Sequence, residues 1–179
     1  MRKIIIFAML MASWGSATAC SALLDHEVRK LGEEETVSLC DYQGQVIVVV
    51  NTASRCGYTK QYASLEKLYS EHREQGLVVL GFPSNDFSQE PGTEEQIQSF
   101  CRLTYGVEFP MFAKSSVRGN APEPIYEGLA EASGRYPQWN FHKYLIARDG
   151  SYVADFPSSV DPLSNRMMDL VERELVRKF

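Results

Sequence analysis

Residues 46–57 read VIVVVNTASRCG, and this stretch decides the fold. Its first five residues are all apolar and β-branched, without the polar alternation of a strand that has one face in water. Such a run predicts a strand buried on both faces, as in sheets that are covered by helices on both sides. Cys56 follows almost at once, at the carboxyl end of the expected strand.

A helix and a second buried strand are expected next along the chain. Tyr62, Leu65 and Tyr69 recur at helical spacing, and Gly76 is placed to end that helix. Residues 77–80 (LVVL) then predict another buried strand. The order strand, helix, strand implies a parallel pair joined by a crossover.

The remaining segments predict elements that flank this unit. They are a hairpin of 23–31 and 34–39 around Gly32, a helix over 94–104 with a Thr93/Gln96 capping box, a strand or extended segment over 109–117, a helix over 124–132, strands 144–147 and 152–156 around Asp149-Gly150, and a last helix from Pro162. The sum is an α/β chain with a mixed central sheet flanked by helices and an N-terminal β-hairpin. This pattern fits a thioredoxin-like fold.

The composition is that of a globular domain, and it argues against several kinds of site. The chain has 179 residues, of which 44% are hydrophobic and 23% charged, and its net charge is −5. A nucleic-acid surface needs a basic stripe, which this charge balance argues against. The three histidines lie far apart and the four cysteines form no CxxC pair, so we expect neither a metal nor an organic cofactor.

The N-terminus is typical of a cleaved secretory signal peptide. A positively charged start precedes an apolar stretch too short to span a bilayer comfortably, and residues 17–19 (ATA) suit a signal peptidase. We expect removal of residues 1–19, which leaves 20–179 as a single exported domain without an integral membrane span, periplasmic if the source is a Gram-negative bacterium. A lipoprotein acylated on Cys20 is the second choice, and a buried N-terminal helix the third.

Cys56 is the candidate nucleophile. Reactive groups in open α/β sheets gather at the carboxyl ends of strands, where this residue lies. The amides at the start of the following helix and the charge of Arg55 would favour a thiolate, which is the form that attacks a peroxide O–O bond. The alternative is a cysteine that is simply buried in the core.

Four short motifs resemble those of the glutathione peroxidase family. They are NTASRCGYT at 51–59, LGFPSNDF at 80–87, QEPG at 89–92 and WNF at 139–141, and they occur in the family's order. The resemblance implies a thiol peroxidase that reduces hydrogen peroxide and organic hydroperoxides. It places Cys56 where the family has its peroxidatic cysteine or selenocysteine. Because this chain has cysteine there, the resemblance implies the same cycle as in selenocysteine members, at a slower rate.

The resemblance also implies a set of hydrogen-bond donors around the sulfur. In the family these are an indole N–H, an Asn amide and a Gln amide, and Trp139 and Asn140 match the first two. The Gln position is assigned to Asp86, whose ionised carboxylate would only accept hydrogen bonds and would oppose a thiolate. Three alternatives follow: Asp86 is protonated, or it turns away, or Asn85 supplies the missing amide. Taken alone, Trp139 could equally be a core aromatic residue and Asn140 a turn residue.

Cys101 is assigned a second step by the same resemblance. Thioredoxin-dependent members of the family have a resolving cysteine in such a Phe-Cys context, and Phe100-Cys101 matches it. The resolving thiol condenses with the Cys56 sulfenic acid to form a disulfide. The alternative is that Cys101 only packs on the apolar face of its helix, and a buried resolver would require local unfolding of that helix.

The resemblance further implies an external thiol as reductant, either a thioredoxin-like protein or glutathione, and a role in the response to oxidative stress. Tetrameric members of the family carry an insertion near the stretch between Ala130 and Trp139, which is short here, so the resemblance implies a monomer. Cys20 and Cys40 remain, and an even remainder in an exported chain predicts a disulfide. The rival functions are a thiol-disulfide carrier of the same fold, which the missing CxxC pair argues against, and a redox sensor that shares Cys56 and Cys101.

Overall fold

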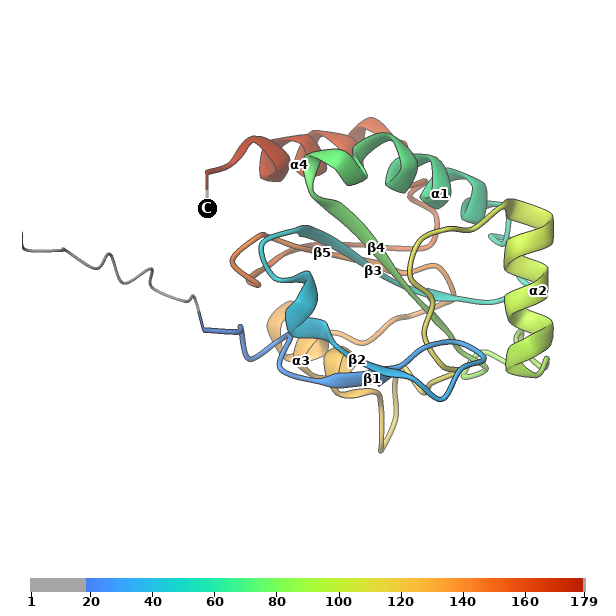
Figure 1. The fold of residues 1–179 in the computed structure, drawn as a ribbon. Helices are drawn as coiled ribbons and strands as arrows, with labels where there is room; N and C mark the ends of the chain where they lie inside the picture. The colour runs from blue at the N-terminus through green and yellow to red at the C-terminus, as the bar shows by residue number, and fades with distance from the viewer. Residues whose placement is uncertain (1–18, 179) are drawn as a thin grey trace, which may run out of the picture.

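The computed structural model describes residues 19–178, so the expected signal peptide lies almost wholly outside the described residues. The core of the molecule is a four-stranded sheet in the order β4-β3-β5-β6 (Figure 1). Its strands are β3 (Val46–Thr52), β4 (Leu77–Pro83), β5 (Lys143–Ile146) and β6 (Tyr152–Phe156). The β3–β4 pair is parallel and the other two pairs are antiparallel, which confirms the mixed sheet.

Helices cover both faces of the sheet, as the apolar run of β3 predicted. Figure 1 shows α1 (Gln61–His72) and α4 (Asn165–Val176) along one face. The other face carries α3 (Pro124–Ser133) and the hairpin of β1 (Glu27–Arg29) and β2 (Thr36–Ser38). Helix α2 (Glu94–Tyr105) stands at one end of the sheet. Two short 3₁₀ helices, η1 (Leu39–Tyr42) and η2 (Arg73–Gln75), complete the described elements.

The alternation of β3 side chains explains why its sequence is apolar throughout. Val46, Val48 and Val50 belong to the core under α1 and α4. Ile47 and Val49 belong to the core over α3 and the hairpin. Successive strand residues point to opposite faces, so a strand between two cores needs apolar residues at every position.

Most element boundaries agree with the sequence pattern, and the last helix is the main exception. The Thr93/Gln96 capping box of α2 is present. By contrast, α4 begins at Asn165 rather than at Pro162, because Asp161 builds a separate turn before the helix. The Asp161 carbonyl accepts hydrogen bonds from the backbone N–H of Ser164 at 3.0 Å and from its hydroxyl at 2.7 Å. Pro162 therefore lies in a turn and not in the first turn of the helix.

The 109–117 segment is extended without forming a full strand. It makes single bridges, from Phe112 to Lys30 of the hairpin side and from Met111 to Gly81 of β4. A Cβ on Gly81 would lie only 2.3 Å from the Met111 sulfur, so glycine permits this close approach. Within residues 19–178, no helix has both the length and the apolar character needed to cross a membrane.

Candidate functional site

The Cys56 loop connects the end of β3 to the start of α1. The Thr59 hydroxyl organises this loop: it accepts the Cys56 N–H at 3.0 Å and lies within donating distance of the Ala53 and Cys56 carbonyls. Helix α1 begins only at Gln61, so the N–H that reaches the sulfur comes from the preceding turn. Tyr58 donates it to Cys56 Sγ at 3.4 Å. A backbone donor therefore faces a half-buried thiol, an arrangement that stabilises a thiolate.

Glu90 holds the other side of the same loop. Its carboxylate is buried, and one oxygen accepts both the backbone N–H and the hydroxyl of Ser54 at 2.8 Å. Burial raises the pKa of Glu90, and the two bonds from Ser54 act in the opposite direction. The neighbouring carbonyl of Gln89 accepts the Arg55 N–H at 3.0 Å. Glu90 belongs to the QEPG motif, but its sequence position did not reveal this structural role.

Asn51, the next-to-last residue of β3, fixes the WNF segment beside the Cys56 loop. Its side-chain amide donates to the Trp139 carbonyl at 3.1 Å and accepts from the His142 N–H at 3.0 Å. The Trp139 ring packs against Phe87 with centroids 5.3 Å apart and remains 41% exposed. Phe141 adopts a positive φ of 61°, so this tight segment carries backbone strain.

Asn140 is fully buried and meets a residue that sequence reasoning did not assign. Its amide nitrogen donates to Gln89 Oε1 at 2.9 Å. Its own oxygen has no hydrogen-bond partner among residues 19–178. Gln89 is therefore held at two points: its side-chain oxygen accepts from Asn140, and its backbone carbonyl accepts the Arg55 N–H of the Cys56 loop. In the sequence, its position in the QEPG motif was the one feature that could have marked Gln89 as a candidate site residue.

Asp86 is oriented differently from the expectation that it faces the sulfur. Its carboxylate Oδ2 accepts the N–H groups of Val117 at 2.7 Å and Arg118 at 3.2 Å, and the Ser116 hydroxyl at 3.0 Å. Three donors from the 116–118 loop thus bind one carboxylate oxygen of Asp86. This favours the alternative that Asp86 turns away from the sulfur. Asn85 is exposed, and its side-chain oxygen accepts the Glu90 N–H at 2.9 Å. The Asp86 and Asn85 side chains therefore bind the 116–118 loop and the Glu90 N–H, while Gln89 is the side-chain amide bonded to Asn140.

Cys101 lies on α2, only 2% exposed, in the same core against which Cys56 packs. Both are free cysteines. Burial raises the pKa of Cys101 to about 11, and the Tyr62 hydroxyl beside it acts in the opposite direction. This thiol is protonated and shielded in the folded chain, so any attack by it requires α2 to open locally.

Cys20 and Cys40 form a disulfide, as the cysteine count predicted, with their Cα atoms 5.6 Å apart. The bond ties the segment before β1 to η1. Nearby, the Gln43 side chain also holds this segment, through the Ala19 carbonyl and the Ser21 N–H. The disulfide is thus part of a structural attachment at the N-terminal edge of the described chain.

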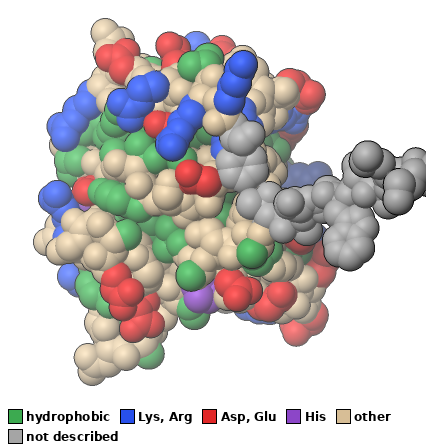
Figure 2. Space-filling model, turned by 90° about the vertical axis from the view of Figure 1, so that its left-hand side faces the viewer, with side chains coloured by type: hydrophobic (Ala, Val, Ile, Leu, Met, Phe, Trp, Pro, Cys, Tyr) green, Lys and Arg blue, Asp and Glu red, His purple; other side chains and the backbone are tan. Residues whose placement is uncertain are grey.

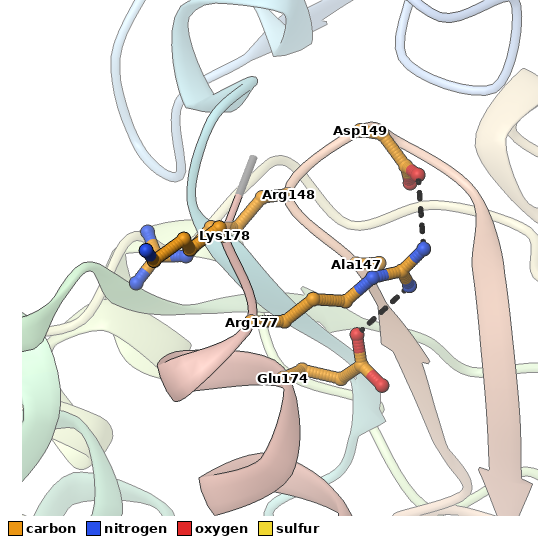
Figure 3. A pocket seen from close by; sticks show the side chains of 6 residues that line it. All are labelled: Ala147, Arg148, Asp149, Glu174, Arg177 and Lys178. Atoms are coloured by element: carbon orange, nitrogen blue, oxygen red, sulfur yellow. Dashed lines mark hydrogen bonds and ion pairs between the residues drawn. The ribbon is translucent and has the colours of Figure 1, made fainter.

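A hollow of about 240 Å³ lies at the opposite end of β3 from Cys56, beside the β5–β6 turn and the end of α4. Figure 3 shows Arg177 between Asp149 and Glu174, with ion-pair distances of 3.8 and 3.3 Å. Arg148 donates to the carbonyls of Gly44, Gln75 and Leu175. Lys and Arg side chains gather over part of this end of the molecule (Figure 2). These paired charges connect chain segments, and they offer no nucleophile comparable to Cys56.

Comparisons with known proteins identify relatives of the whole domain. Residues 23–130 match the family described as glutathione peroxidase. A protein named glutathione peroxidase from Lactococcus lactis subsp. cremoris is 48% identical over 133 residues, covering 72% of this chain and 85% of the relative. The glutathione peroxidase-like peroxiredoxin gpx1 of Schizosaccharomyces pombe is 42% identical over 125 residues, covering 67% and 79%. The crystal structure of Trgpx in its apo form superposes with a TM-score of 0.69 at 31% identity, covering 87% of this chain and 96% of that chain. The expected thioredoxin-like fold is confirmed.

Proposed function

Because this chain belongs to the glutathione peroxidase family and is a peroxidase, we propose that it reduces hydroperoxides through a cycle that begins at Cys56. The Cys56 thiolate attacks one peroxide oxygen, the O–O bond breaks, and the leaving oxygen takes a proton to become water or an alcohol. Cys56 is oxidised to a sulfenic acid in this step.

The observation that carries this proposal is the arrangement around the Cys56 sulfur. The Tyr58 amide donates to the sulfur, while Glu90 fixes the loop on one side. Asn140 and Gln89 bond to each other, and both are held near Cys56. The Asn140 segment is bonded to Asn51 at the end of β3, and Gln89 is bonded to Arg55 of the Cys56 loop. Trp139, next to Asn140 and partly exposed, would supply its indole N–H as a further donor. Such donors would stabilise the thiolate and orient the peroxide.

Cys101 is proposed to resolve the sulfenic acid. Its thiolate attacks Cys56 sulfur, hydroxide leaves and is protonated to water, and a Cys56–Cys101 disulfide forms. Because Cys101 is buried on α2, the step requires local opening of that helix. Its placement in the core that also contacts Cys56 supports this assignment.

An external dithiol protein of the thioredoxin type is the proposed reductant. A protein disulfide is reduced by exchange with a thiolate and then a second thiol, and a dithiol partner provides both within one molecule. The test is steady-state peroxide consumption with a thioredoxin-like protein or with glutathione. Many turnovers with the dithiol protein support the proposal, whereas a single turnover with every reductant favours the redox-sensor alternative.

Export and a role against oxidative stress are part of the same proposal. The Cys20–Cys40 disulfide suits an oxidising compartment outside the cytosol. The test is the mass of the mature N-terminal peptide from the native host. A peptide beginning at or very near Cys20 without acyl chains supports secretion, whereas acyl chains on Cys20 would make the protein a lipoprotein.

A further inference from the structure

Lys143, the first residue of β5, is a buried cation that the peroxidase cycle above does not use. Its side chain has an exposed fraction of 0%. Nζ donates to Gln61 Oε1 at 2.9 Å, to the Val160 carbonyl at 2.6 Å and to the Pro157 carbonyl at 3.4 Å. None of these three partners is a carboxylate, although a buried lysine is normally paired with one. Burial lowers the pKa of Lys143 to about 7, and Asp161 acts in the opposite direction.

The hydrogen bonds of Lys143 lead directly to the Cys56 loop. Gln61 is the first residue of α1, and its side chain also donates to the Ser158 carbonyl at 2.7 Å. The Gln61 N–H donates to the Tyr58 carbonyl at 2.8 Å. Tyr58 in turn donates its N–H to Cys56 Sγ at 3.4 Å. A short chain of contacts therefore connects the buried ammonium to the turn that holds the sulfur.

Two buried charges of opposite sign thus anchor the Cys56 loop at its two ends. Glu90 binds Ser54, two residues before the cysteine. Lys143 binds Gln61, five residues after it. Burying either charge costs free energy, so a purely structural attachment could have used neutral groups at lower cost.

We propose that Lys143 is a positioning residue for Cys56. Through Gln61 its side chain fixes the first turn of α1, and wherever Nζ is protonated its positive charge favours the thiolate over the thiol at Cys56. The proposal adds a positioning residue to the proposed peroxidase function. It rests on that function only because it treats Cys56 as the nucleophile. Glu90 acts in the opposite electrostatic sense while holding the other end of the loop.

The experiment measures how the rate of Cys56 alkylation by iodoacetamide depends on pH, with the Cys56 peptide quantified by mass spectrometry. Only the thiolate reacts, so the midpoint of the profile reports the environment of the sulfur without any peroxide. In Lys143→Met we expect the midpoint to move to higher pH by roughly half to one unit. In Glu90→Gln we expect it to move to lower pH.

The opposite directions separate an electrostatic role from simple loosening of the loop. Gln61→Glu is a near-isosteric second variant that places a carboxylate against the ammonium, and it should also move the midpoint upward. Lys178→Met removes a cation at the other end of the molecule and should leave the midpoint unchanged. A midpoint unchanged in both Lys143→Met and Gln61→Glu would overturn the proposal, as would shifts of the same sign in Lys143→Met and Glu90→Gln. The expected shifts in a protein that consumes no peroxide would support the positioning role and reject the peroxidase cycle.

Discussion

The two cysteine pairs of this chain occupy regions that differ in almost every physical respect. Cys20 and Cys40 are half-buried, lie at the N-terminal edge of the described chain, and are already joined. Cys56 and Cys101 are free and border the main core under α1 and α4. The Cys56 sulfur accepts a backbone N–H, whereas Cys101 is shielded from solvent on α2.

The difference shows that surroundings, rather than residue type, separate a structural cysteine from a reactive one. The Cys20–Cys40 bond closes a short loop and restrains the unfolded chain. The Cys56–Cys101 pair would have to break part of the packed core before it could join. A disulfide there would be a transient state of a cycle, whereas the N-terminal one is a permanent attachment.

The largest expected effect is the loss of peroxide chemistry in Cys56→Ser. A serine hydroxyl lacks the nucleophilicity of a thiolate, so the rate of reaction with hydrogen peroxide should fall at least about 1000-fold. Stopped-flow measurement of peroxide consumption checks this. The double variant Cys20→Ser/Cys40→Ser is the matched control and should react at the parent rate, and equal losses in the two proteins would erase the contrast between the pairs.

The second effect concerns stability and should appear only at the N-terminal pair. The disulfide closes a loop with a sequence separation of 20 residues. Its removal in Cys20→Ser/Cys40→Ser should lower the free energy of unfolding by about 3 kcal/mol. Urea unfolding of parent and variant measures the change. A stability equal to that of the parent would mean that Gln43 and its neighbours hold the segment without the bond.

The sequence predicted the β3 strand, the hairpin, the α2 capping box and the disulfide because each depends on local pattern or on counting. It left three alternatives open for Asp86 because the direction of that side chain depends on donors about 30 residues away, in the 116–118 loop. Gln89 was quoted within a motif, but nothing local shows that its amide meets Asn140. Lys143 escaped notice because a charged residue at the start of a strand is usually exposed.

The third effect is a pH dependence that belongs to Cys101. Burial raises the pKa of Cys101 from its ordinary value of 9.0 to about 11, so the folded chain keeps this proton where the unfolded chain releases it. Stability should therefore decrease as pH rises from about 9 to about 11, by up to about 1.4 kcal/mol per pH unit. Urea unfolding at several pH values, compared with Cys101→Ala, isolates this contribution. Identical pH dependence in both proteins would show that the thiol is not shielded as described.

The smallest effects separate Gln89 from Asp86 as the residue that contributes to the reaction with peroxide. Gln89→Met removes the partner of Asn140 and so loosens that amide, and the rate of peroxide attack should fall roughly tenfold, the equivalent of one hydrogen bond. Asp86→Asn should leave that rate within about twofold, since its carboxylate binds the 116–118 loop, and should instead lower stability by about 1 kcal/mol. Stopped-flow rates and urea unfolding of both variants check this. The reverse ranking of the two rates would return Asp86 to the site.

The most direct test of the account is a peptide map of the protein after one equivalent of hydrogen peroxide, with Cys101→Ser treated in parallel. Condensation of a sulfenic acid with a thiol predicts linked Cys56 and Cys101 peptides in the parent, while the Cys20–Cys40 bond stays unchanged. In Cys101→Ser, trapping with a sulfenic-acid reagent should label Cys56 alone. A parent protein in which Cys56 remains a free thiol, or in which Cys101 is never linked to it, would contradict the assignment of the two cysteines.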